Sequence, residues 1–172
     1  MYQQHFGLNS KPFSLTPDPD FLFLGKNHQT ALTLLNYGMT SEAGLTVISG
    51  EVGSGKTTLI RRLLDNCGEE VTVGLISNAH GAFGELLEFV LMAYGLDYHN
   101  KTKTELYQVF SDFLIEQYAQ NKRTALIIDE AQNLDIDTLE ELRMLTNINQ
   151  GKHMVLQLIL VGQPELLETM RR

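Results

Sequence analysis

The sequence predicts an α/β domain in which a parallel β-sheet is covered by helices on both faces. Short apolar segments rich in β-branched residues alternate with longer segments whose apolar residues recur every three or four positions. The first pattern is typical of buried strands and the second of amphipathic helices, and their alternation is typical of parallel sheets. The expected strands are 45–49, 71–76, 124–128 and 155–161. The expected helices are 28–39, 56–66, 82–94, 105–120 and 138–145, with a last one beginning near 165.

Composition limits the classes of protein to which the chain can belong. Its 172 residues suffice for one domain with a core, and 43% apolar with 20% charged residues is typical of soluble globular proteins. The net charge of −8 disfavours a broad surface that binds duplex DNA, although it does not exclude a small basic patch. Cys67 is the single cysteine, so no internal disulfide forms. No segment approaches 18 uninterrupted apolar residues and no signal peptide is evident, so we expect a cytoplasmic domain without a membrane span.

Residues 1–40 are expected to form a lead-in that packs on a core formed by 41–172. Three prolines between 12 and 19 exclude a regular helix in that stretch. A disordered tail rarely contains many large apolar side chains. This one contains Phe6, Phe13, Phe21, Leu22, Phe23 and Leu24. We therefore expect the lead-in to lie against the core.

A phosphate-binding loop is the strongest single motif. Residues 50–57, GEVGSGKT, match G-x-x-x-x-G-K-[ST] at every fixed position, and a chance match in a chain of this length is about one in a hundred. The motif follows a predicted strand and precedes a predicted helix, as phosphate binding requires. Lys56 should reach the β- and γ-phosphates of ATP, and the Thr57 hydroxyl should ligate Mg²⁺. The residues expected to hold the phosphates are Gly53, Ser54, Gly55, Lys56, Thr57 and Thr58.

Two carboxylates follow the third predicted strand. Asp129 and Glu130 come directly after the apolar segment LII, about 70 residues beyond the phosphate loop. Ligands bind at the carboxyl ends of strands in open α/β sheets, so Asp129 is expected to bind Mg²⁺ directly or through water. Glu130 should point elsewhere, because side chains alternate along a strand, and could polarise the water that attacks ATP. The alternative is that Asp129 and Glu130 are only solvated side chains where the strand passes into a loop. Their position after a strand and about 70 residues beyond the phosphate loop favours a role in an ATPase site.

Four segments resemble the AAA+ ATPases of the general secretion pathway protein A type, a group that includes ATPases encoded beside exosortase and exopolysaccharide genes. They are HFGLNSKPFSLTPDPDFLFL, GEVGSGKTTLIRRLL, LIIDEAQNLDIDTLEELRMLTNI and LILVGQPELL. Together they extend the resemblance over essentially the whole chain. The first and last are more specific than the phosphate loop, which occurs across all P-loop proteins.

The resemblance implies a P-loop NTPase three-layer sandwich with strand order 5-1-4-3-2. It implies that Gln163, after the fourth strand, is a sensor that contacts the γ-phosphate or the attacking water. The alternative is that Gln163 is a loop residue whose side-chain amide bonds only to backbone. It suggests that Asn78 holds Glu130 inactive until ATP arrives. The alternative is that Asn78 has only a structural role, because asparagine is common where a strand ends. The adenine base would be lined by residues from the lead-in, with core packing as the alternative for the leucines. These are Phe21, Leu22, Leu24 and His28.

The family's fifth strand and helical lid are expected beyond residue 172, together with an arginine finger and a second sensor. Arg171 and Arg172 are not expected to replace them, because the matching arginines lie further on. The residues 1–172 alone should therefore bind ATP but hydrolyse it slowly, because loss of an arginine finger can cost ~10³ to 10⁵ in rate.

The resemblance implies an ATP-driven motor or switch. ATP binding would promote homo-oligomer assembly, and hydrolysis would remodel an envelope-assembly partner in secretion, exopolysaccharide export or pilus formation. Parts beyond 172 could hold the protein at the inner face of the inner membrane. A DNA-acting ATPase of the transposition-regulator or initiator-loader type is the alternative, which the acidic charge disfavours. A nucleotide or sugar kinase is disfavoured because only 13 basic residues are present and no arginine cluster follows the second strand.

Overall fold

The computed structural model describes residues 2–8, 23–41, 44–77 and 85–171. In chain order, the elements are α1 (Tyr2–Phe6), α2 (Lys26–Thr40), β1 (Leu45–Ser49), α3 (Lys56–Asp65), β2 (Val71–Ile76), α4 (Leu86–Ala93), α5 (Lys103–Ala119), β3 (Arg123–Ile128), the 3-10 turn η2 (Ala131–Asn133), α6 (Ile136–Thr146), β4 (Asn149–Gln150), β5 (His153–Met154), β6 (Leu156–Gly162) and α7 (Glu165–Thr169).

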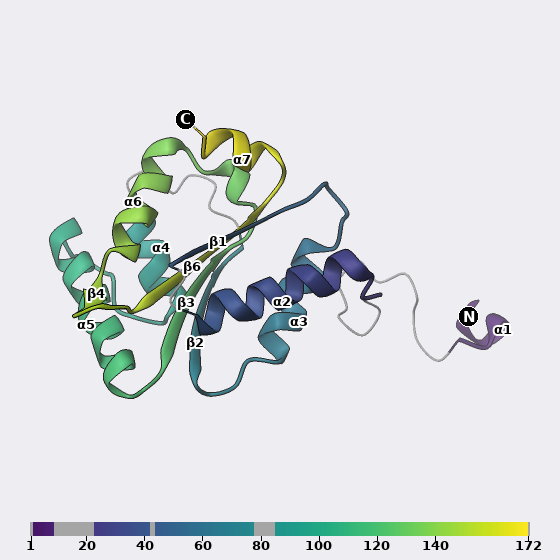
Figure 1. Cartoon of the computed structure of the whole chain (residues 1–172), viewed down its shortest axis with the longest axis horizontal. Coiled ribbons are helices and arrows are strands. Elements are labelled where there is room, and N and C mark those ends of the chain that lie inside the picture. Colours follow the sequence, from purple (N-terminus) through teal and green to yellow (C-terminus); the bar gives the residue numbers. More distant parts are fainter. Residues whose placement is uncertain (1, 9–22, 42–43, 78–84, 172) are drawn as a thin grey trace.

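A four-stranded parallel sheet forms the centre of the molecule (Figure 1). Its strand order is β1-β6-β3-β2, and each neighbouring pair is parallel. This order corresponds to 1-4-3-2 of the order that the resemblance implies, with β6 as the fourth strand. Among the described residues, nothing pairs with the outer edge of β1, which is where the fifth strand is expected.

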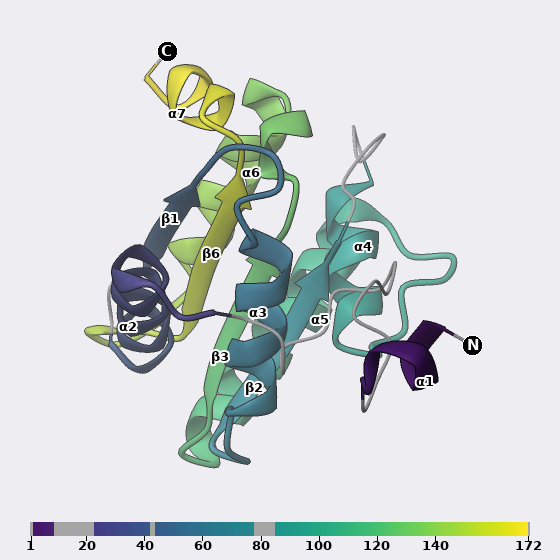
Figure 2. The same cartoon turned by 90° about the vertical axis from the view of Figure 1, so that its right-hand side faces the viewer.

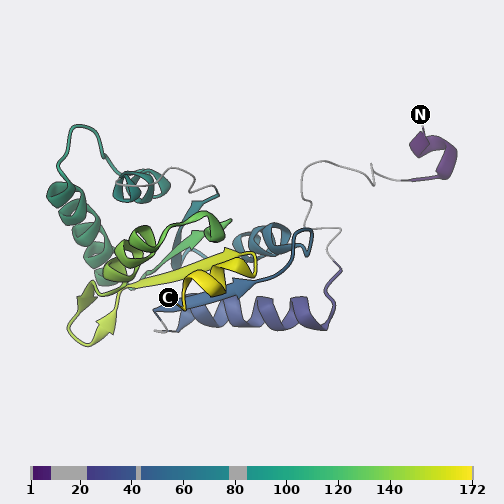
Figure 3. The same ribbon diagram turned by 90° about the horizontal axis from the view of Figure 1, so that it is seen from above.

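Helices cover both faces of the sheet, as predicted. Helices α2 and α3 lie on one face, and α4, α5 and α6 lie on the other (Figures 2 and 3). The central strand β3 shows how the sequence achieves this. Ala125 and Ile127 belong to the core beneath α2 and α3, whereas Leu126 and Ile128 belong to the core beneath α4 to α6. All four side chains are fully buried. Because successive side chains of a strand point to opposite faces of the sheet, β3 contributes to both cores.

The predicted elements and the observed ones differ mainly at their ends. Helix α2 begins two residues earlier than expected, and α5 begins at Lys103 because Thr102 and Glu105 form a capping box ahead of it. The Glu105 carboxylate accepts the Thr102 backbone N–H, which lowers the pKa of that carboxyl. The antiparallel pair β4–β5 was not expected, and its turn contains Gly151 at a φ of 66°.

Gly74 in β2 makes room for an aromatic ring from the end of α4. A Cβ at Gly74 would lie 2.7 Å from the ring of Tyr94, whose hydroxyl donates to the Ala125 carbonyl at 2.8 Å. Because alanine would push the ring out of place, Gly74→Ala should lower the free energy of unfolding by about 1–3 kcal/mol, measured by urea denaturation. Tyr94→Phe is the matched control, since it removes only the hydrogen bond and should cost about 1 kcal/mol. Wild-type stability in Gly74→Ala would contradict this account of the packing.

Candidate nucleotide-binding site

The phosphate loop connects β1 to α3 at the carboxyl end of the sheet. Gly53 and Gly55 have φ angles of 76° and 85°, in the left-handed region that glycine adopts without strain. Gly55 is also the N-cap residue of α3 and supplies no side-chain cap. The first N–H groups of α3 therefore remain available to an anion, and the positive end of the helix dipole adds to their attraction.

Lys56 extends back over the loop that precedes it. Its half-buried ammonium group donates to the carbonyl oxygens of Gly50 at 2.7 Å and Glu51 at 3.0 Å. A cation held beside the first N–H groups of α3 makes this end of the loop attractive to phosphate. Thr58 lies in the first turn of α3 and is half-buried.

Thr57 and Asp129 meet across the site. The Thr57 hydroxyl donates to Asp129 Oδ2 at 2.8 Å, and Asp129 is 4% exposed at the end of β3. The other carboxylate oxygen, Oδ1, accepts the Glu130 backbone N–H at 2.9 Å. One hydroxyl and one carboxylate oxygen are the hard ligands that Mg²⁺ takes from protein when phosphates and water complete its shell. These residues therefore fit a magnesium ion between α3 and β3.

Glu130 leaves the strand through a strained turn. Its φ of 55° and ψ of 35° are left-handed, which costs a residue other than glycine about 1–2 kcal/mol. The sequence predicted that Glu130 diverges from Asp129 because side chains alternate in a strand. In the structure, the strand has already ended, and the left-handed turn sets the direction of Glu130. Its Oε2 accepts a hydrogen bond from Gln132 Nε2 at 2.7 Å.

The end of β6 brings Gln163 to the same edge. The Gly50 backbone N–H donates to the Gly162 carbonyl at 3.1 Å, which ties the start of the phosphate loop to this strand. The backbone N–H of the next residue, Gln163, donates to Gln132 Oε1 at 3.0 Å. The phosphate loop, the acidic pair and Gln163 are thus assembled by the carboxyl ends of β1, β3 and β6.

A cavity of about 250 Å³ lies beside the phosphate loop and is lined in part by Ala31, Ile48 and Leu59. His28, near the start of α2, also lines it and lies with Nε2 at 2.8 Å from the Ser54 carbonyl, so Nε2 carries the hydrogen. The apolar walls suit the base of a nucleotide whose phosphates lie in the loop. Of the other residues predicted for the base, Leu24 packs against the core beneath α2 and α3.

Phe21, Leu22 and Asn78 lie outside the described residues. Their predicted contacts with the base and with Glu130 therefore stay predictions.

Comparison with known proteins decides the family. The sequence profile of a family described as "AAA domain" matches residues 39–170. The chain belongs to the AAA domain family. An AAA domain binds ATP, and the family implies ATPase activity.

The AAA domain is also 38% identical over 173 residues to General secretion pathway protein A of Aeromonas hydrophila. This match covers 100% of the chain but 32% of that protein, so the chain spans about a third of its curated relative. The resemblance identified in the sequence is thereby confirmed.

Solved structures support the fold. The ORC2 protein of Aeropyrum pernix in its ADP form has a TM-score of 0.62 at 19% identity, over 98% of this chain and 47% of that one. The ADPNP–ADP complexes of the same protein give 0.59, at 19% identity over 94% and 46%. Cdc6p of Pyrobaculum aerophilum gives 0.62 at 16% identity, over 90% and 42%. At such identities the likeness establishes the fold of the AAA domain alone.

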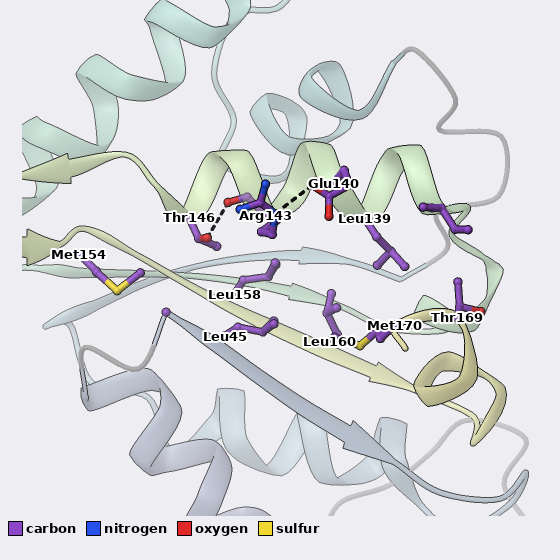
Figure 4. A pocket seen from close by; sticks show the side chains of 12 residues that line it. Leu45, Leu139, Glu140, Arg143, Thr146, Met154, Leu158, Leu160, Thr169 and Met170 are labelled. Atoms are coloured by element: carbon purple, nitrogen blue, oxygen red, sulfur yellow. Dashed lines mark hydrogen bonds and ion pairs between the residues drawn. The ribbon is translucent and has the colours of Figure 1, made fainter. Parts of the chain in front are cut away.

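A larger cavity of about 310 Å³ lies on the other side of the AAA domain's edge strand, between β1, β6, α6 and α7 (Figure 4). Leu45, Leu139, Leu158, Leu160 and Met170 make its walls apolar, and the Arg143–Glu140 ion pair lies among its lining residues. It has no residue of the phosphate loop in its lining, whereas the smaller cavity is lined by Gly50, Ser54 and Lys56. Within the described part of the chain, no helix is long and apolar enough to cross a membrane.

Sequence reasoning missed Gln132. The residue lies in the segment DEAQ, two positions after Glu130, and the structure shows it bonded to Glu130 and to Gln163. A polar side chain two positions after the acidic pair was the available signal. Its two partners could not be inferred, because they depend on the turn η2 and on the end of β6.

Proposed function

We propose that this AAA domain hydrolyses MgATP, with Lys56, Thr57, Asp129 and Glu130 as the residues that carry the reaction. The main support is the meeting of the Thr57 hydroxyl, the Asp129 carboxylate and Glu130 beside a glycine-rich loop that ends in Lys56. A metal-ligating pair, a candidate base and a phosphate-binding loop at one sheet edge are the parts that ATP hydrolysis requires.

In this proposal, the phosphates replace the carbonyl groups of Gly50 and Glu51 as partners of Lys56. Thr57 and Asp129 would hold Mg²⁺, which would neutralise charge on the phosphates when it is bound. Glu130 accepts a proton from water while the water oxygen attacks the γ-phosphorus. The bond from the γ-phosphorus to the bridging oxygen breaks, and ADP and phosphate are released. The Gln163 amide donates to the γ-phosphate or to the water, and His28 with the lead-in borders the base.

At the level of the pathway, we propose that hydrolysis powers assembly or remodelling of a bacterial envelope export system. The support is the 38% identity to General secretion pathway protein A over the entire chain. We further propose that ATP binding drives homo-oligomer assembly, because a neighbouring subunit would then supply the arginine finger that the resemblance implies.

The test is ATP hydrolysis by the full-length protein. We expect turnover that requires Mg²⁺, that stops on addition of EDTA, and whose specific activity rises with protein concentration as subunits associate. Duplex DNA should not change the rate, because the chain has a net charge of −8. Strong stimulation by DNA would instead favour a DNA-acting ATPase. Hydrolysis independent of Mg²⁺ would contradict the assignment of Thr57 and Asp129.

A further inference from the structure

The side-chain amide of Gln132 connects three parts of the candidate site. Its Nε2 donates to Glu130 Oε2 at 2.7 Å, and its Oε1 accepts the Gln163 backbone N–H at 3.0 Å. The residue before Gln163, Gly162, accepts the backbone N–H of Gly50 in the phosphate loop. A path of hydrogen bonds and chain connectivity therefore runs from the phosphate loop, through the end of β6, to the carboxylate of Glu130.

The orientation of this amide follows from its partners. A backbone N–H can only donate, so the atom of Gln132 that faces Gln163 must be the carbonyl oxygen. An ionised carboxylate can only accept, so the atom that faces Glu130 must be the amide nitrogen. A reversed amide would lose both bonds, and the two contacts together hold the side chain in one rotamer.

The end of β6 is shaped to admit this side chain. A Cβ at Gly162 would lie 2.9 Å from Gln132 Oε1 and 3.1 Å from the Gln132 backbone nitrogen. Any larger residue at position 162 would therefore push the amide away from Gln163. The close approach of η2 to β6 thus depends on a glycine directly before the predicted sensor.

Gln132 bonds to only one of the two oxygens of the Glu130 carboxylate. The bond from Gln132 Nε2 goes to Oε2, and none of the bonds described above for the site involves Oε1. A carboxylate with one oxygen fixed and the other open can present the open one to a water in a defined direction. Holding a base in this way matters because a displacement of about 1 Å can cost ~100-fold in rate.

We infer that Gln132 is a positioning residue that orients Glu130 for proton transfer and couples it to the strand end that carries Gln163. This inference rests on the proposed ATPase function. Gln132 acts through Glu130, so its loss reduces turnover without a matching loss of nucleotide affinity.

Gln132→Glu is the sharpest test, because it keeps size and shape. The new carboxylate still accepts the Gln163 N–H, but it cannot donate to Glu130 and it repels that carboxylate. In the full-length protein we expect kcat to fall by ~10- to 100-fold, with KM and the Kd for MgATP within about twofold of wild type. Gln132→Ala removes both bonds and should likewise lower kcat with little change in KM or in the Kd for MgATP. Asn133→Asp, the same chemical change at the next, exposed position, should leave kcat unchanged.

A double variant separates positioning from a structural role. If Gln132 acts through Glu130, Gln132→Glu should cost nothing further in a Glu130→Gln background, because the group that it orients is already absent. Independent losses that multiply, or a fall in kcat matched by an equal loss of nucleotide affinity, would overturn the inference. Wild-type kcat in both Gln132 variants would also overturn it while leaving the ATPase assignment intact. A wild-type protein that does not hydrolyse MgATP would instead reject the proposed function itself.

Discussion

The Lys56→Ala variant is expected to bind MgATP roughly 100-fold more weakly than the wild-type chain. Lys56 lies half-buried over the phosphate loop, with its ammonium group 2.7 Å from the Gly50 carbonyl. A phosphate oxygen that replaced this carbonyl would gain a charge-assisted hydrogen bond. Such bonds contribute about 1.5–3 kcal/mol each, and two of them correspond to a factor of ~150 or more in Kd.

Isothermal titration with ATP, Mg²⁺ and the purified chain measures this effect directly. Lys122→Ala is the matched control, because Lys122 lies just before β3, at the opposite end of the sheet from the phosphate loop, and its loss removes the same charge. We expect the control to bind as the wild type does. Equal Kd values for wild type and Lys56→Ala would place the nucleotide elsewhere and would contradict the assignment of the loop.

The fold was predictable because its signals are local. The strand at 45–49 and the loop at 50–57 specify a strand, a turn and a helix within 20 residues. The burial of β3 on both faces is evident from the unbroken apolar segment 125–128. The meeting of Thr57 and Asp129 also followed, since the carboxyl ends of parallel strands share one edge of a sheet.

What the sequence did not reveal depends on long-range geometry. The bond from Gln132 to Glu130 needs the left-handed backbone of Glu130, and a single sequence gives no reason to expect a non-glycine residue in that conformation. The bond from Gln132 to Gln163 joins residues 31 positions apart and needs a glycine, Gly162, at the end of β6 where η2 approaches it. The helix ends were less predictable than the helices, because capping by Thr102 or Asp135 shifts the first residue by two.

Glu130→Gln should abolish most ATP turnover while leaving nucleotide binding intact. The amide has the size of the carboxylate but cannot accept a proton from the attacking water, and loss of a general base typically lowers kcat by ~10²- to 10⁴-fold. The contacts that would bind MgATP are made by Lys56, Thr57 and Asp129, which the substitution does not touch. We therefore expect a Kd for MgATP within about threefold of wild type, with kcat measured by phosphate release.

This variant also tests the proposed assembly. If ATP binding drives association and hydrolysis reverses it, Glu130→Gln should stay oligomeric in MgATP, as measured by sedimentation, whereas the wild-type protein returns to its dispersed state as ATP is consumed. Asp137→Asn, which removes an exposed carboxylate in the first turn of α6, is the matched control and should behave as wild type. Undiminished turnover in Glu130→Gln would show that another group accepts the proton. The strained turn at Glu130 would then need a different explanation, because backbone strain of this kind is held in place by the surrounding structure and is concentrated where it serves a function.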